Sequence, residues 1–536
     1  MATVESTAPG AAGPVRRGAS GALAACALAV VVFLIAVLPR LANISLFITP
    51  DEDNWMRRTG NFARAIERGD LVRTFQSGHP GVVTMWVAWL GIGPEASRLA
   101  GITGPDPMVT RLAGFVELLA RARTAFAATN SVLIVGIVLL VLRLWGTVPA
   151  WLAGGLLAWD PFLVAHGQVV HLDALASGLM MLAMLSGAVF WRERSWRFLA
   201  LCGVATGLAV ATKAPSMFLA VFVPIIALSG RLAEQPRPSW RWTLGTVAAC
   251  GAAALATLLA VWPAMWVAPV DTVSRWIEYT LVTAEAPHGP GNFFLGTAVA
   301  DPGAWFYPVA VAMRLTPIVV VGLACFAIAR APSRSRWQSM MLFDFMLGFL
   351  LFVTLAGKKL DRYALPMFPS LDILAALGIW CVASRLGLLS RTANAIGMVV
   401  IVAGVQAASL WSSYPYPLAY YNPLLGGINA AQRTLLVGWG EGLDQVANYL
   451  NAQPNAESSR IAVYYPLTIN FQGMVRGTVQ SFGAPQPADY VVDYINAAQR
   501  RQTPREVSGL TADFTATIHG VTFARVYRLS TPRAID

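Results

Sequence analysis

Long apolar runs separated by short polar or basic stretches fill the chain from about residue 20 to residue 411. Because a helix needs roughly 20 apolar residues to cross the hydrocarbon core of a bilayer, each run predicts one membrane-spanning helix. The first run is followed by Pro39 and Arg40 without a small-residue cleavage site, which favours an uncleaved span over a secretory signal. The pattern predicts eleven crossings, at residues 20–39, 124–143, 147–164, 172–191, 198–212, 214–229, 243–266, 304–330, 339–356, 364–383 and 390–411.

The connection formed by residues 40–123 is long enough to contain structure of its own. Segment 81–92 is apolar but too short to span, so we expect it to be re-entrant or interfacial. If it instead crosses together with a partner in 94–123, the total becomes thirteen and the orientation is unchanged. Segment 51–68 has the periodicity of an amphipathic helix that lies on a membrane surface. Its predicted apolar face carries Trp55, Thr59, Phe62 and Ile66.

The pattern changes after Trp411, where the chain becomes polar. A helical period over 443–450 is followed by strand-like alternation at 460–465 and 521–529. Residues 412–536 are therefore expected to form a small soluble α/β domain.

Composition agrees with a membrane protein, because 56% of the 536 residues are hydrophobic and only 12% are charged. The net charge of +11 does not indicate nucleic-acid binding, since the arginines lie in short clusters between apolar runs. The five cysteines lie in or beside apolar runs, and no pair has metal-ligand spacing. Neither a disulfide framework nor a zinc site is expected.

The basic loops determine the predicted orientation, because cytoplasmic loops of membrane proteins carry an excess of Lys and Arg. The basic clusters fall on one side, which places residues 1–19 in the cytoplasm and residues 412–536 outside. The expected fold is a polytopic α-helical membrane protein with about 11 to 13 transmembrane helices and a small extracytoplasmic α/β domain. The expected location is the plasma membrane, with the transmembrane domain at 20–411 and its functional face outside.

The acidic triplet Asp51, Glu52 and Asp53 lies just past the first span on the outer side. A carboxylate at a dry membrane edge can have its pKa raised toward neutrality, which suits a general base. Acidic residues at a helix start also cap free amides and complement the helix dipole. One cap needs fewer than three acids, so at least one is expected to have another role.

Two further outer segments carry polar residues at the edges of apolar runs. His79 is followed by Pro80 in a turn and is a candidate for phosphate contact or proton transfer, although a lone turn histidine is more often structural. Asp173 begins a span, where an unpartnered carboxylate is costly, so a functional role is favoured. His166 and His171 lie close to it and permit a divalent metal without requiring one.

Cations on the outer side complete the candidate chemistry. Lys213 lies between two apolar runs, where it either pairs with an anion or snorkels to the interface. Lys358, Lys359 and Arg362 break the positive-inside pattern, which is best tolerated where an anion such as a lipid phosphate is their partner. Carboxylates and cations at one membrane face are what a reaction on a lipid phosphate needs, because cations stabilise the departing anion.

These motifs resemble those of the GT-C superfamily of membrane glycosyltransferases, especially glycosyltransferase family 39, with the protein O-mannosyltransferases and aminoarabinose transferases. Asp51-Glu52 resembles the acidic motif of the family's first external loop, and Leu172-Asp173 a second short motif. Lys213-Ala214-Pro215 is similar to a Lys-Gly-Pro motif, with Ala in place of Gly. Residues 359–366 are similar to a Lys-x-x-x-Tyr-x-Leu-Pro stretch. His79-Pro80-Gly81 departs from the Lys-Pro-Pro of the aminoarabinose branch.

The resemblance implies an inverting transferase that moves a sugar from a polyprenyl-phosphate donor to a hydroxyl of a protein, lipid or glycan acceptor. By the same likeness, Asp51 is the expected base, and Glu52 and Asp173 orient it or the acceptor. The donor phosphate would be held by Lys213, Lys359 and Arg362, with Tyr363 and His79 beside it. A transporter or flippase of lipid-linked sugars is the main alternative, although the charges gather at one face and no internal repeat is visible. A binding protein whose tail senses a partner is another.

Overall fold

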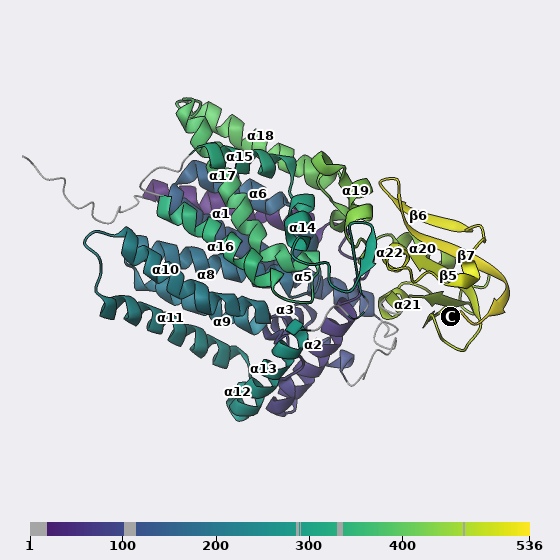
Figure 1. The fold of residues 1–536 in the computed structure, drawn as a ribbon. Helices are drawn as coiled ribbons and strands as arrows, with labels where there is room; N and C mark the ends of the chain where they lie inside the picture. The colour runs from purple at the N-terminus through teal and green to yellow at the C-terminus, as the bar shows by residue number, and fades with distance from the viewer. Residues whose placement is uncertain are drawn as a thin grey trace, which may run out of the picture.

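The computed structural model describes residues 19–100, 114–285, 289, 291–329, 336–464 and 467–535. The predicted N-terminal tail, apart from Ala19, lies outside the described residues, as do residues 101–113 of the first long loop. The long helices run side by side in one bundle, and the C-terminal domain lies at one end of it (Figure 1).

The bundle corresponds segment by segment to the predicted spans. Its helices are α1 (Ala19–Leu41), α5 (Phe115–Trp145), α6 (Thr147–Trp159), α7 (Pro161–Gly167), α8 (Asp173–Glu193), α9 (Trp196–Thr212), α10 (Phe218–Ala233), α11 (Trp240–Val261), α14 (Phe306–Arg314), α15 (Pro317–Ile328), α16 (Arg336–Thr354), α17 (Phe368–Arg385) and α18 (Thr392–Trp411).

The number of spans is lower than expected. Among the described residues, eight helices are long and apolar enough to cross a membrane, or ten if each of two bent pairs is one span. The bent pairs are α6 with α7, at 59°, and α14 with α15, at 113°. The remaining predicted span is α9, which has only 17 residues. The predicted class, a helical membrane protein of many spans, is confirmed, and by length and composition the described residues give at most ten of the eleven to thirteen predicted crossings.

Small residues let α9 pack closely against α11. A Cβ added to Gly207 would lie 2.4 Å from the carbonyl oxygen of Ala254, and one added to Gly203 would lie 2.7 Å from that of Cys250. Small residues spaced four apart are a common means of bringing two membrane helices together. This contact connects α11 to the bundle, although most of its surface is exposed.

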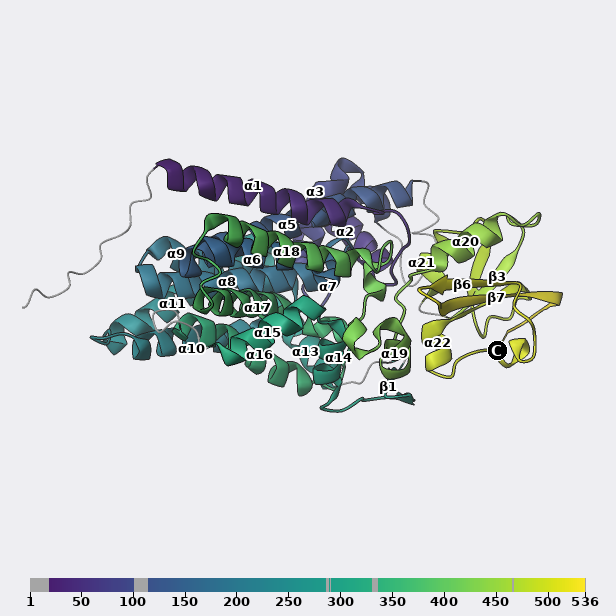
Figure 2. The ribbon, with the colours of Figure 1, turned by 90° about the horizontal axis from the view of Figure 1, so that it is seen from above.

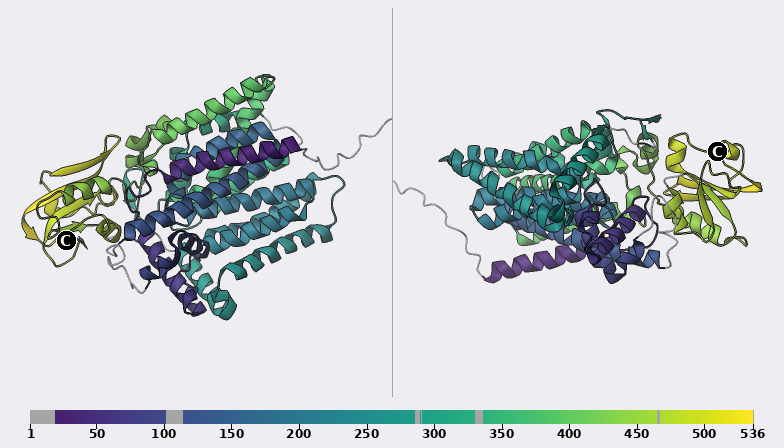
Figure 3. Two further views of the ribbon diagram at one scale, coloured as in Figure 1. Left: turned by 180° about the vertical axis from the view of Figure 1, so that it is seen from behind. Right: turned by 90° about the horizontal axis from the view of Figure 1, so that it is seen from below.

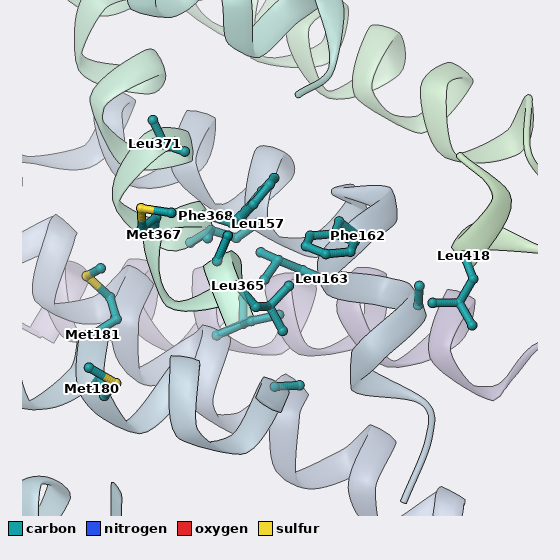
Figure 4. Packing of buried hydrophobic residues seen from close by; sticks show 14 of the residues in the cluster. Leu157, Phe162, Leu163, Met180, Met181, Leu365, Met367, Phe368, Leu371 and Leu418 are labelled. Carbon is teal, nitrogen blue, oxygen red and sulfur yellow. The ribbon is translucent and has the colours of Figure 1, made fainter. Parts of the chain in front are cut away.

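A second contact region lies where α7, α8 and α17 meet. Phe162 and Phe368 pack ring against ring at 4.9 Å between centroids. Leu365 of the short 3₁₀ segment η5 (Asp361–Met367) is fully buried in the same cluster, shown in Figure 4. Burying a large apolar side chain contributes about 1.5–3 kcal/mol, so this packing fixes η5, which carries Arg362, relative to the start of α8.

Shorter elements cover the end of the bundle that carries the C-terminal domain. They are α2 (Glu52–Glu67), η1 (Leu71–Thr74), α3 (Val82–Ile92), η2 (Gly93–Leu99), η3 (Ala214–Met217), α12 (Ala264–Val267), α13 (Pro269–Glu285) and the hairpin β1 (Asn292–Phe294) with β2 (Thr297–Val299). The predicted amphipathic helix is confirmed as α2, but Trp55 and Phe62 are buried against protein. The expectation that this face lies on a membrane surface is therefore wrong.

The chain after Trp411 forms a mixed five-stranded sheet, seen edge-on in Figure 2 and from two other sides in Figure 3. The strand order is β4-β3-β5-β7-β6, in which β3 pairs in parallel with β4 and β5, whereas β7 is antiparallel to β5 and β6. The expected small C-terminal α/β domain is confirmed. Its elements are η6 (Pro417–Ala419), η7 (Pro423–Leu425), α19 (Gly427–Thr434), α20 (Leu443–Asn451), β3 (Arg460–Val463), α21 (Thr468–Gln472), β4 (Thr478–Ser481), β5 (Ala488–Tyr494), α22 (Ile495–Gln499), η9 (Arg505–Val507), β6 (Phe514–Ile518) and β7 (Val521–Arg533).

Candidate functional site

Asp51 lies immediately before α2, where a helix cap would be expected, but its side chain makes no capping hydrogen bond. Its Oδ2 instead lies 2.9 Å from Nη2 of Arg362 and 3.3 Å from Nε2 of His171. Burial on its own would raise the pKa of this carboxyl, but Arg362 and His171 together hold the pKa below its usual range. The expectation of a raised pKa for Asp51 is therefore wrong, because two cations that are distant in the sequence lie against it.

His171 connects Asp51 to the start of α8. Its Nδ1 lies 2.9 Å from Oδ2 of Asp173, and Oδ1 of the same carboxylate is ion-paired with Lys213. Although burial acts against a charged imidazole, Asp173 and Asp51 raise the pKa of His171 above its ordinary value. A protonated His171 thus separates two carboxylates that would otherwise repel each other.

The cations of the site are oriented by aromatic rings. Nζ of Lys213 lies 4.1 Å from the ring centroid of Tyr363, and Cζ of Arg362 lies 4.6 Å from that of Trp439. Nε of Arg362 also lies 3.5 Å from Oδ2 of Asp173, so this guanidinium touches both carboxylates. Asp51, Asp173, Lys213, Arg362 and Tyr363, all selected in the sequence, are therefore brought together.

Glu52 serves a structural purpose next to this cluster. Its carboxylate is ion-paired with Arg123 of α5 and accepts hydrogen bonds from the backbone N–H groups of Thr49 and Val170, at 2.9 and 3.0 Å. The hydroxyl of Thr49 donates a further bond of 3.0 Å. A carboxylate with so many donors is held in place, and it fixes the entry to α2 against the turn before α8. Arg123 was missed in the sequence because it adjoins an ordinary apolar run.

Asp53, the third acid of the triplet, is buried. Burial and the nearby charge of Asp51 raise the pKa of Asp53 to about 7. A hydrogen bond with the backbone of Asn54 acts in the opposite direction. The raised pKa foreseen for the triplet therefore belongs to Asp53 rather than to Asp51.

Lys359 points away from the carboxylate cluster. Its ammonium lies 2.9 Å from Oδ1 of Asp301 and donates a hydrogen bond of 2.7 Å to the carbonyl of Ala356. Its neighbour Lys358 is half-buried and, within the described part of the chain, has no carboxylate within ion-pairing distance. Burial lowers the pKa of Lys358, and the nearby charge of Arg362 lowers it further. Lys358 is thus the lysine of the pair that is available to an anion.

His79 lies on the same side as Lys358. Its ring contacts Tyr279 of α13 edge to face, at 5.1 Å between centroids. Burial and the neighbouring charges of Lys213 and Lys358 lower the pKa of His79 to about 3. The side chain is therefore neutral at neutral pH, able to donate one hydrogen bond but carrying no charge. Arg58, half-buried over the Trp55 ring at 4.6 Å, adds a further nearby cation.

A metal site does not assemble around the candidate histidines. In the described residues, no group of three or more His, Cys, Asp or Glu side chains is arranged to hold a metal ion. The His171 ring lies between two carboxylates, while His166 packs between Phe162 and Trp439, at 4.8 and 5.6 Å.

The C-terminal domain contributes Trp439 and Glu441 to the wall of the site. Trp439 contacts the His171 ring at 5.3 Å, and Glu441, fully buried next to it, accepts a hydrogen bond from the backbone N–H of Trp439. Together with Asp51 and Arg362 they line a cavity of about 160 Å³. Sequence reasoning missed both residues; the one available signal was the run of glycines around them at 438–442, in a segment without a known motif.

No curated protein matches the sequence. Similar solved structures include ArnT from Cupriavidus metallidurans in the apo state, with a TM-score of 0.48 and 15% identity over 95% of this chain and 98% of that one. The same protein bound to undecaprenyl phosphate gives a TM-score of 0.46 and 14% identity, with the same coverage.

A second similar structure is the archaeal oligosaccharyltransferase AglB from Archaeoglobus fulgidus, in complex with an inhibitory peptide and a dolichol-phosphate. It gives a TM-score of 0.46 and 11% identity over 88% of this chain and 70% of that one. The family model of dolichyl-phosphate-mannose-protein mannosyltransferases matches residues 107–265, which include Asp173 and Lys213. With this match, the chain's resemblance to the GT-C glycosyltransferases, family 39 in particular, is confirmed.

Proposed function

We propose that the chain transfers a sugar from a polyprenyl-phosphate donor to a hydroxyl acceptor at the outer face of the plasma membrane, with inversion of the anomeric carbon. One observation carries the proposal: four segments far apart in the sequence bring Asp51, His171 with Asp173, Lys213 and Arg362 into one cluster. Carboxylates and cations in contact at the end of a helical bundle suit a reaction in which an anion departs and a proton is removed.

In the proposed step, the acceptor oxygen attacks the anomeric carbon and forms the new glycosidic bond. The bond between that carbon and the phosphate oxygen breaks, and its electron pair leaves with the polyprenyl phosphate. The hydroxyl proton passes to Asp51. Because one displacement occurs from the face opposite the leaving group, the configuration inverts. The low pKa of Asp51 keeps the carboxylate ionised before the donor binds.

The donor phosphate is proposed to bind on the side of Lys213, Lys358 and Arg362. Lys358 is available because it lacks a carboxylate partner in the described part of the chain, while neutral His79 can donate a hydrogen bond to a phosphate oxygen. Lys359, held by Asp301, is assigned a structural role. A phosphate that attracts Arg362 also weakens the hold of this arginine on Asp51, which makes the carboxylate a stronger base when the donor is present.

The proposed orientation places the N-terminus in the cytoplasm and both the site and the domain at 412–536 outside. It rests on the basic clusters at the opposite end of the bundle, such as Arg192 to Arg197 and Arg231 to Arg241. The sugar, hexose or pentose, is to be identified by assay.

The test uses reconstituted full-length protein and a panel of polyprenyl-phosphate hexoses and pentoses, with release of polyprenyl phosphate as the readout. Asp51→Asn is expected to lower the rate of release by about 10²-fold or more, since general base catalysis contributes about that much. Asp70→Asn, at a half-exposed carboxylate paired with Arg73, is the matched control and should retain the rate. Full activity of Asp51→Asn would overturn the assignment, and movement of donor across the membrane without release would indicate a transporter.

A further inference from the structure

The cavity between Asp51 and the C-terminal domain has the size of a single ring. Its volume is about 160 Å³, close to the roughly 150 Å³ of an apolar cavity that holds a benzene molecule. Of the three cations assigned to the donor phosphate, Lys213 and Lys358 do not line it, whereas Arg362 does. Asp51, which receives the acceptor proton, lines it as well. The cavity therefore adjoins the base and reaches the donor cations only at Arg362.

Its charges cancel within the wall. Three arginines and three carboxylates line it, namely Arg314, Arg362, Arg500, Asp51, Asp361 and Glu441. Arg314 is paired with Asp361 at 2.6 Å, and Arg362 with Asp51 at 2.9 Å. Because two of the three arginines are already paired and the formal charges of the wall balance, the wall favours a neutral ligand over a strongly anionic one.

Two deeply buried polar atoms of the wall lack partners. Oδ1 of Asn496 and Nδ1 of His166 have no hydrogen-bond partner among the described residues, and the two side chains are only 6% and 2% exposed. A buried polar atom without a partner is unfavourable, so a ligand that supplies hydroxyl groups at these points is stabilised by forming the missing hydrogen bonds. The other amide atom of Asn496 is already used, donating at 3.2 Å to the carbonyl of Gly438.

Aromatic side chains complete the wall. Trp439 is half-buried, so part of its indole is accessible to a ligand, and Phe306 and Tyr421 line the same space. The electron-rich face of an aromatic ring attracts slightly positive C–H groups, which a pyranose ring presents on its flat sides.

We propose that this cavity binds a neutral sugar ring of the acceptor, so that the C-terminal domain selects a glycan, whose ring hydroxyl is glycosylated, over a peptide. The inference rests on the proposed glycosyltransferase function and names its acceptor class. The partner atoms are Oδ1 of Asn496 and Nδ1 of His166, with Trp439 against the ring. An extended peptide would instead need a groove or a strand edge along its length.

Binding is tested first, without donor, by saturation-transfer NMR on the full-length protein in nanodiscs with the methyl glycosides of glucose, galactose, mannose and arabinose. A Ser/Thr-containing peptide is the competing probe. The glycoside signal is expected for the wild type and for Gln486→Ala, an exposed control in the same domain, and to fall about fivefold or more in Asn496→Ala. Asn496→Asp and Trp439→Phe provide milder changes if the alanine variant folds poorly.

Transfer is then measured with the donor that releases polyprenyl phosphate, using neutral oligosaccharides of the binding sugar as acceptor. Asn496→Ala is expected to raise the acceptor KM about tenfold or more without changing the donor KM. Binding of the peptide alone, or glycoside binding that is unchanged in Asn496→Ala and Trp439→Phe, would overturn the inference. Failure of every donor to release polyprenyl phosphate, with glycoside binding intact, would count against the proposed function and leave the sugar site supported.

Discussion

His171 is the residue whose protonation holds the site together, because it lies between Asp51 and Asp173. Its raised pKa means that the stabilisation is fully present below the unfolded value of about 6.5 and is lost as pH rises through the folded value. Relative to His171→Gln, the wild type should therefore melt at a higher temperature near pH 6 and lose this advantage at alkaline pH. Thermal unfolding in detergent over that range is the measurement.

The same exchange at the exposed His519 provides the control for the His171 experiment. His519 has a left-handed backbone, so its exchange can shift the melting temperature, but the shift should be the same at every pH. A difference between wild type and His171→Gln that stays constant from mildly acidic to alkaline pH would show that His171 is neutral in the folded protein.

Lys358 and Lys359 are adjacent but are expected to behave differently. Lys358→Gln removes a cation available to the donor phosphate, and a lost charged hydrogen bond of about 1.5–3 kcal/mol corresponds to a donor KM raised about tenfold or more. Lys359→Gln breaks the pair with Asp301 and should lower thermal stability while leaving the donor KM unchanged. Initial rates against donor concentration, with melting curves, distinguish the two. A raised donor KM in Lys359→Gln alone would reverse the assignment.

For single residues, the sequence indicated which charged side chains belong to the site but not which partner each of them has. Asp51, Asp173, Lys213 and Arg362 were identifiable because charged side chains at the edges of apolar runs are costly without partners. The choice between Lys358 and Lys359 depends on the direction of the backbone at one turn. Two lysines in succession give no local pattern from which that direction could be derived.

Among the elements, the contact between α9 and α11 depends on the absence of a side chain. Gly207→Ala would place a methyl group 2.4 Å from the carbonyl oxygen of Ala254, so the helices must separate. Overpacking of this kind costs about 1–3 kcal/mol. The expected result is a lower melting temperature in detergent. Gly245→Ala in α11, with nothing within 4 Å of the added carbon, should be neutral or slightly stabilising. Equal effects of the two changes would contradict the close contact.

The helices themselves were largely predictable, since hydrophobic length determines where a chain can cross a bilayer. The bend of 113° between α14 and α15 was not, because Pro317 at the start of α15 explains the break but not its angle. The buried face of α2 was also misjudged. Its periodicity is the same whether the apolar side chains meet lipid or the protein segments α3 and η2.

For the whole molecule, the position of the C-terminal domain depends on a close approach at Gly440. This glycine has φ +112°, and a Cβ on it would lie 2.7 Å from the carbonyl oxygen of Ile48, in the segment that leads to Asp51. Gly440→Ala is expected to displace the domain and lower the transfer rate, because Trp439 next to it contacts Arg362. The rate of transfer and limited proteolysis of the domain are the measurements.

Gly483→Ala is the matched control for domain displacement. Gly483 also has a left-handed backbone, at φ +81°, but nothing lies within 4 Å of the added carbon. Gly483→Ala therefore introduces a similar backbone strain of about 1–3 kcal/mol but no steric collision. If both variants lose activity equally, strain within the domain and not its position is responsible. The docking itself was outside the reach of sequence analysis, since Gly440 and Ile48 are far apart in the chain.

The pairing of Arg362 with Asp51 also has a consequence for the sequence of events during turnover. While the guanidinium holds the carboxylate, water or an alcohol that enters early meets a poor proton acceptor. In the proposed reaction, arrival of the lipid phosphate would draw the guanidinium away and activate the base. Such a site favours an ordered kinetic scheme in which donor precedes acceptor, and it protects a costly lipid-linked sugar from wasteful hydrolysis until both substrates are in place.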